Sequence, residues 1–153
     1  MMNLSCNVIK TLNGKTLVTA ESCTGGGIGA ALTAVPGSSK VYKGGIISYT
    51  DEVKMKQLQV QSELLDRVGA VSAEVAEAMA SGARKILSAD IAVSVTGLAG
   101  PDGDDRGNPV GTVFVGYADV TGVFSKKFCF SGNREEVREQ TILSALQMIL
   151  DMQ

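Results

Sequence analysis

The residues of this chain that could carry out covalent chemistry gather in segment 19–29, whose sequence is Thr-Ala-Glu-Ser-Cys-Thr-Gly-Gly-Gly-Ile-Gly. Ser22 and Cys23 are two candidate nucleophiles side by side. The glycines after them let the backbone approach a ligand closely, and the amides at a helix start favour negative charge. The segment therefore predicts either a nucleophile or an anion-binding cradle at the corner between a strand and a helix.

The chain contains no histidine. This excludes Ser-His-Asp and Cys-His nucleophile pairs within the chain, and it removes the commonest zinc ligand sets, so we predict no metal site. An activated serine would have to use Lys, Asp, Glu or Tyr as its base. The spacing Ser-x-x-Lys does not occur anywhere in the sequence, so a lysine base must come from another part of the fold.

Lys54 is the best-placed candidate for such a base. It lies in the first turn of a helix expected after the second strand, at the same sheet edge as Ser22 if the first two strands are parallel. A base active near neutrality needs a pKa about 3 units below that of free lysine, which a dry corner between two helix starts could supply. Tyr49 could relay a proton or orient this lysine. Spacing alone leaves three rivals in the same region: Lys40, Lys43 and Lys56.

Hydrophobic periodicity, capping residues and turn residues predict the elements that would position these groups. Strands are expected at 16–21, 41–49, 90–96, 110–117 and 123–130, and helices at 4–12, 25–34, 51–58, 63–68, 72–88 and from 133 onward. Their order indicates an α/β protein: a single three-layer α/β/α domain over residues 1–153. Its mixed sheet should carry an antiparallel hairpin at one edge. Gly45, inside the second strand, marks a bulge or a close backbone approach.

The longest predicted loop, 97–109, is rich in glycine, proline and aspartate. Compact domains seldom carry such a loop without a function, so it is a second candidate for the site. The motif Gly25-x-Gly27-x-x-Ala30 matches the start of a dinucleotide-binding fingerprint. The acidic residue that should follow near positions 46–50 is missing, which argues against a dinucleotide site.

Composition excludes several other classes. Hydrophobic residues make up 44% of the chain and charged residues 20%, as in ordinary globular proteins. A net charge of −2 and the lack of tryptophan argue against nucleic-acid binding. No apolar run is long enough for a membrane span, and no secretion signal is recognisable. Three scattered cysteines suggest reduced thiols, so we expect a cytoplasmic protein.

Several motifs together resemble the CinA C-terminal domain family. They cover nearly the whole chain in order: segments 19–26, 36–39, 45–54, 69–72, 94–103, 109–113 and 130–134. Stand-alone members of that family are nicotinamide-nucleotide amidases, which hydrolyse nicotinamide mononucleotide to nicotinate mononucleotide and ammonia. The resemblance thus implies a small-molecule substrate, with no nucleic acid, no membrane and no cofactor.

By the same resemblance, Ser22 is the nucleophile, Lys54 its general base and Tyr49 a helper. Backbone amides from Cys23 to Gly26 would hold the oxyanion, and the loop from Thr96 to Gly103 would take the 5′-phosphate. The substrate-binding residues expected on this basis are Thr24, Gly25, Gly26, Gly45, Thr96, Gly97, Gly100 and Arg134. Related chains often carry Ser-Asn after the tyrosine, whereas this one has Thr50-Asp51, and an acid beside Lys54 opposes its deprotonation.

Longer family members carry an additional amino-terminal domain that resembles a molybdopterin-binding fold; none is expected here, which favours a free-standing amidase. We also expect a homo-oligomer. Three alternatives stay open: a non-catalytic nucleotide-binding module, an interaction domain in competence or recombination, and an amidase acting on a different carboxamide. Cys23 also remains an alternative nucleophile.

Overall fold

A computed structural model describes all residues, Met1–Gln153. Its centre is a five-stranded sheet in the order β2-β1-β3-β4-β5. The first three of these, β2, β1 and β3, are parallel, whereas β4 and β5 continue the sheet as an antiparallel hairpin. The predicted mixed sheet with a hairpin at one edge is confirmed. The strand bounds are β1 Leu17–Glu21, β2 Tyr42–Ile47, β3 Ile91–Gly97, β4 Thr112–Asp119 and β5 Gly122–Cys129.

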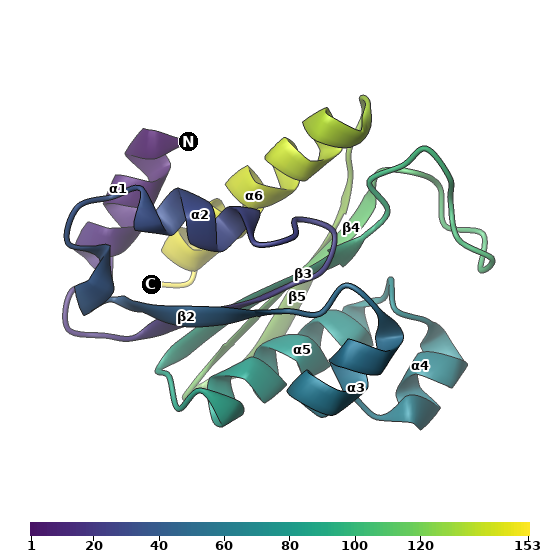
Figure 1. Ribbon diagram of the computed structural model, residues 1–153, viewed down its shortest axis with the longest axis horizontal. Coiled ribbons are helices and arrows are strands. Elements are labelled where there is room, and N and C mark those ends of the chain that lie inside the picture. The colour runs from purple at the N-terminus through teal and green to yellow at the C-terminus, as the bar shows by residue number, and fades with distance from the viewer.

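Helices cover both faces of this sheet, which makes the three layers visible in Figure 1. One layer contains α1, α2 and α6, and the other contains α3, α4 and α5. None of these helices has the length and apolar character needed to cross a membrane. The helix bounds are α1 Met2–Thr11, α2 Gly27–Thr33, α3 Asp51–Leu58, α4 Ser62–Val68, α5 Ala73–Ile86 and α6 Arg134–Asp151.

The core is divided by the sheet into two apolar clusters. Side chains alternate along a strand, so in β1 Leu17 packs under α1, α2 and α6 while Val18 packs under α3, α4 and α5. Every residue of β1 is buried. This is the pattern of a central strand covered on both faces, and it places the end of β1 in the middle of the molecule.

Three helices begin at the capping residues expected from the sequence. The hydroxyls of Thr50 and Ser72 each accept a hydrogen bond of 3.3 Å from the third amide of α3 and α5. Asn133 and Glu136 form a complete capping box at the start of α6, with hydrogen bonds of 2.7 and 3.0 Å. These caps fix where α3 and α6 begin, and both helices bring residues to the site.

The carboxyl ends of β2, β1 and β3 meet at one edge of the sheet because the three strands are parallel. Each is followed by a turn that carries polar or glycine residues. In the layer that contains α3, α4 and α5, α5 comes so close to α3 that a Cβ added at Gly82 would overlap the carbonyl of Leu58. Glycine at this position therefore allows α3 to pack directly against α5.

Candidate active site

Ser22 and Lys54 meet at this edge of the sheet. Ser22 is the first residue after β1, and its amide donates to the carbonyl of Val95 in β3 at 3.2 Å. Lys54 lies in the first turn of α3 and reaches back under the corner, where its Nζ is 3.1 Å from the Oγ of Ser22. Its side chain is only 1% exposed. A serine hydroxyl and a buried amine are thus within hydrogen-bonding distance.

The surroundings of Lys54 shift its protonation equilibrium toward the neutral form. Burial lowers the pKa of Lys54 below the ordinary 10.5, while the negative charge of Asp51 opposes this shift. No carboxylate forms an ion pair with it, because the only salt bridge in the protein joins Lys56 to Glu52. Its other polar contact is the carbonyl of Ser48, which accepts a hydrogen bond of 2.7 Å from Nζ. A neutral amine can keep this bond and turn its lone pair to Ser22.

The three rival lysines lie elsewhere. The Nζ of Lys43 donates to the carbonyls of Leu87 and Ser88, at 2.7 and 3.0 Å. Lys56 pairs with Glu52 on the exposed face of α3, and Lys40 is exposed in a short 3₁₀ turn, Ser38–Lys40, that the sequence did not predict. Only Lys54 contacts the serine.

Cys23 is a poor nucleophile in this setting. Its side chain is 5% exposed, and burial raises the pKa of its thiol to about 11, against smaller opposing effects that include the positive charges of Lys54 and Arg138. The thiolate is the reactive form of cysteine, so Cys23 is almost entirely in its unreactive form at neutral pH. Of the two neighbouring candidates, Ser22 is the one with an adjacent amine.

The buried carboxylate of Glu21 binds the amides at the start of α2. Its Oε2 accepts hydrogen bonds from the hydroxyl of Thr24 at 2.6 Å and from the amides of Gly26 and Ile28 at 3.1 and 3.0 Å. Its Oε1 accepts from the amide of Gly29 at 2.9 Å. The amides that could have cradled an external anion are therefore bound to an internal one. Sequence analysis did not identify this role, because Glu21 ends β1 and lies several residues before α2 rather than in the first turn of that helix, where an acid is the usual signal.

Two amides of the corner remain without a partner in the protein. The amide of Gly25 donates to the carbonyl of Ser22 at 3.1 Å, and that of Gly26 is bound to Glu21. The amides of Cys23 and Thr24 donate to no other residue. Of the four amides expected to hold an oxyanion, these two are therefore the unpaired ones; Cys23 lines the pocket described next, whereas Thr24 is fully buried beside it.

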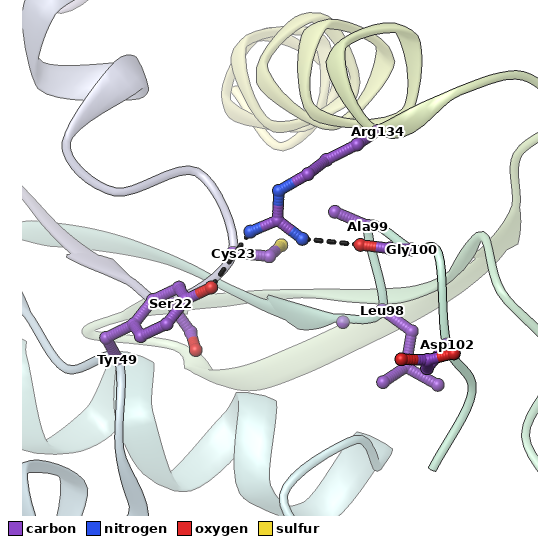
Figure 2. Close-up of a pocket in the computed structure, with 9 residues that line it drawn as sticks. Ser22, Cys23, Tyr49, Leu98, Ala99, Gly100, Asp102 and Arg134 are labelled. Carbon is purple, nitrogen blue, oxygen red and sulfur yellow. Dashed lines mark hydrogen bonds between the residues drawn. The ribbon is translucent and has the colours of Figure 1, made fainter.

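A pocket of about 250 Å³ opens above Ser22. Figure 2 shows Arg134 bridging its two walls. One guanidinium nitrogen donates to the carbonyl of Gly100 at 2.6 Å and another to the hydroxyl of Tyr49 at 2.9 Å. Tyr49 is 58% exposed and makes no hydrogen bond with Lys54. The pocket is lined by Ser22, Cys23, Tyr49, Gly97, Leu98, Ala99, Gly100, Asp102 and Arg134.

The other residues expected to contact substrate lie outside this pocket. The hydroxyls of Thr24 and Thr96 are turned inward, the first to Glu21 and the second to the carbonyl of Ala70 at 2.8 Å. Gly45 pairs with Thr19 inside the sheet, and neither Gly25 nor Gly26 reaches the pocket wall. Cys23, Leu98, Ala99 and Asp102 also line it; they belong to the two segments expected at the site, but the sequence did not single them out as substrate-binding residues.

Two arginines missed by the sequence analysis hold the walls of the pocket in place. Arg106 ties the loop after β3 to α4, because its guanidinium donates to the carbonyls of Asp66 and Arg67 at 2.6 and 3.2 Å. Arg138, one turn into α6, donates to the carbonyls of Cys23 and Thr24, both at 3.1 Å. No three His, Cys, Asp or Glu side chains gather as metal ligands.

Known proteins share this sequence and this structure. The family model of the CinA C-terminal domain matches residues 2–153. The chain is 48% identical to the nicotinamide-nucleotide amidohydrolase PncC of Pseudomonas putida over 136 residues, which are 89% of this chain and 85% of that protein. It is 47% identical to a CinA-like protein of Endomicrobium trichonymphae over 137 residues, which are 90% of this chain but 32% of that longer protein.

Among solved structures, a CinA superfamily protein from Escherichia coli superposes with a TM-score of 0.97 at 36% identity, covering 99% of this chain and 90% of that one. The chain spans about a third of the length of several curated relatives and most of the length of the Pseudomonas putida protein. On the family match and on these similarities, the chain belongs to the CinA C-terminal domain family.

Proposed function

We propose that this protein is an amidohydrolase that converts nicotinamide mononucleotide to nicotinate mononucleotide and ammonia through an acyl-enzyme on Ser22. The observation that carries the proposal is the 3.1 Å contact between the Oγ of Ser22 and the Nζ of a lysine that is 1% exposed. The similarity to the Pseudomonas putida nicotinamide-nucleotide amidohydrolase supports the substrate.

In the first step Ser22 attacks the carboxamide carbon. Neutral Lys54 takes the proton of the hydroxyl as the new C–O bond forms, and the carbonyl oxygen becomes an oxyanion. The free amides of Cys23 and Thr24 are the donors available for it. The lysinium then gives its proton to the departing nitrogen, so that ammonia leaves and an ester to Ser22 remains.

In the second step water takes the place of ammonia. Lys54, neutral again, removes a proton from the water as its oxygen attacks the ester carbonyl. The same amides hold the second oxyanion, and Ser22 leaves with the proton that Lys54 returns. The products are the free serine and nicotinate mononucleotide, whose new carboxylic acid releases its proton to bulk water, and Lys54 ends the cycle in its starting state.

The pocket lining suggests how a mononucleotide would lie. Arg134 is the only cation among the lining residues, and its two hydrogen bonds leave further N–H groups of the guanidinium for a phosphate. We therefore place the 5′-phosphate beside Arg134 and Tyr49, and the nicotinamide ring between Ser22 and the segment from Gly97 to Gly100. In this arrangement Tyr49 contacts the substrate and does not assist Lys54.

The proposal is tested by measuring ammonia release from nicotinamide mononucleotide by the wild type and by Ser22→Ala and Lys54→Ala. We expect each variant to lose about 1,000-fold or more in kcat. Lys56→Ala is the matched control, because Lys56 is on the same helix but exposed and paired with Glu52; it should keep full activity. Intact mass should also detect the acyl group on Ser22 after rapid quenching.

Two results would contradict the proposal. An undiminished rate in Ser22→Ala or Lys54→Ala would exclude the Ser-Lys mechanism. A wild type that binds the mononucleotide tightly but releases no ammonia would instead indicate a nucleotide-binding module.

A further inference from the structure

We infer that Arg138 is a positioning residue that sets the direction and strength of the oxyanion donors. The inference rests on the proposed function and deepens it, because it assigns a role in catalysis to a side chain that does not line the pocket. It starts from the two hydrogen bonds of 3.1 Å that the guanidinium donates, from Nε to the carbonyl of Cys23 and from Nη2 to the carbonyl of Thr24.

The first of these bonds orients a free amide. The carbonyl of Cys23 and the amide of Thr24 belong to the same peptide group, which is planar and trans, so that its C=O and N–H point in opposite directions. Holding the carbonyl toward α6 therefore holds the N–H of Thr24 away from α6. This N–H is one of the two at the corner that donate to no other residue.

The second free amide is fixed in the same manner. The amide of Cys23 shares a peptide group with the carbonyl of Ser22, which accepts from the amide of Gly25 at 3.1 Å. The carbonyl of Thr24 accepts from the amide of Gly27 at 3.0 Å as well as from Arg138. Every carbonyl of the turn from Ser22 to Thr24 thus has a donor, and Arg138 supplies the only donor for the carbonyl of Cys23.

The positive charge of Arg138 adds to its effect on the orientation of these peptide groups. Arg138 is half-buried and forms no ion pair with any carboxylate, so its positive charge acts on the peptide groups that it touches. A cation hydrogen-bonded to a carbonyl polarises that peptide group and makes its N–H a stronger donor. The effect grows when the N–H faces a full negative charge, so it favours the oxyanion over the uncharged substrate.

The corner is therefore held from two sides by opposite charges. Glu21 binds the amides that lead into α2, and Arg138 binds the carbonyls that precede them. Between the two, only the amides of Cys23 and Thr24 are left for a ligand. A donor pair that is fixed before the reaction needs no reorganisation during it.

The test compares Arg138→Gln and Arg138→Lys with the wild type. We expect Arg138→Gln to lower kcat for nicotinamide mononucleotide about 10- to 100-fold while KM changes less than about 3-fold, because the lost interaction is made mainly in the transition state. Arg138→Lys keeps the charge but not the fork that spans two carbonyls, so it should recover part of the loss. The second variant also keeps the test decisive if the first is poorly folded.

One further readout and one control variant separate positioning from simple structural support. Burial, Asp51 and Cys23 are what shift the pKa of Lys54, so the acidic limb of the pH–rate profile should stay where it is in both variants. Arg84→Gln is the matched control. Arg84 also donates to a main-chain carbonyl, that of Asp90 at 2.9 Å, but at the opposite end of β3. Its removal should leave kcat and KM unchanged.

Three outcomes would overturn the inference. The first is an Arg138→Gln enzyme as active as the wild type. The second is a loss of kcat accompanied by a displaced acidic limb and an equal loss in Arg138→Lys, which would indicate a structural role. The third is a raised KM for the mononucleotide but not for nicotinamide riboside, which would make Arg138 a phosphate ligand.

A serine-directed probe keeps this test separate from that of the proposed function. If the wild type releases no ammonia from any carboxamide tried, the proposed function fails. Labelling of Ser22 by a fluorophosphonate, followed by intact mass, still reports on the donors, because the adduct carries its oxygen where the oxyanion would lie. Slower labelling in Arg138→Gln than in Arg84→Gln supports the inference, and equal rates overturn it.

Discussion

The carbonyl of Ser48 accepts a hydrogen bond of 2.7 Å from the Nζ of Lys54, which is shorter than the 3.1 Å between that nitrogen and the Oγ of Ser22. The carbonyl is itself held in place, because the amide of Ser48 donates to the carbonyl of Glu21 at 2.7 Å. One N–H of the amine is thereby held on the carbonyl of Ser48. The lone pair and the other hydrogens of Nζ are then left to face the hydroxyl of Ser22. This pair links the end of β2 to the chemistry at the end of β1.

The first prediction concerns the pH dependence of the reaction. Below the pKa of Lys54 the amine is protonated and cannot accept a proton, so kcat/KM should rise as pH increases through that pKa. Burial lowers it and Asp51 raises it. Asp51→Asn should therefore move the acidic limb to lower pH. Glu52→Gln is the control, because Glu52 pairs with Lys56; a shift of equal size there would contradict the assignment to Asp51.

The second prediction is that Lys54→Met inactivates the enzyme yet stabilises it at neutral pH by about 1 kcal/mol, because a buried amine is replaced by an apolar side chain of similar length. The gain should depend on pH. The folded pKa of Lys54 lies below its ordinary 10.5, so the unfolded chain binds more protons between these values and wild-type stability rises with pH there.

Urea unfolding of both proteins at several pH values checks this. The advantage of Lys54→Met should shrink as pH approaches the ordinary pKa of lysine. A methionine variant that is less stable than the wild type at neutral pH would show that the bond to Ser48 outweighs the cost of burying the amine.

The third prediction concerns Cys23. Because burial raises the pKa of its thiol to about 11, Cys23→Ala should keep activity within a few-fold of the wild type. Iodoacetamide at neutral pH should modify the exposed Cys129 well before Cys23, as followed by peptide mass. Loss of activity in Cys23→Ala together with rapid labelling of Cys23 would reverse the assignment of the nucleophile.

The fourth prediction concerns the internal carboxylate. Glu21→Gln replaces an oxygen that accepts bonds with an NH₂ group that must donate, so at least one amide or hydroxyl at the start of α2 loses its partner. We expect a loss of about 2–4 kcal/mol in the free energy of unfolding, measured by urea denaturation. Glu63→Gln, an exposed acid in the first turn of α4, should change it by less than about 0.5 kcal/mol.

Much of the fold was predictable because local signals agree with the global structure. Thr50, Ser72 and Asn133 cap helices through their own side chains, and such caps lie within a few residues of the amides they satisfy. The apolar run of β3 indicated a strand buried on both faces, and it is. Parallel strands, whose ends share an edge, also indicated that a lysine after the second strand could meet Ser22, but the choice of Lys54 among four lysines came from the family resemblance.

What could not be predicted depends on contacts between distant parts of the chain. Arg138 lies 115 residues from Cys23, and Arg134 lies 85 residues from Tyr49. Nothing in the local sequence of α6 indicates which carbonyl or hydroxyl an arginine will reach. The inward turn of Thr24 and Thr96 was missed for a related reason, since a hydroxyl near a glycine loop can face the ligand or the interior with the same sequence.

The packing of α1 against α6, the first and last helices in Figure 1, has a consequence for synthesis of the protein. Ser22 and Lys54 precede α6 in the chain, so the layer formed by α1, α2 and α6 cannot be completed until α6 has been synthesised. The nascent chain therefore carries this serine and this lysine for most of its synthesis without Arg134 and Arg138, which α6 brings to the pocket and to the corner beside Ser22. The proposed hydrolysis would accordingly require α6, although neither Ser22 nor Lys54 belongs to it.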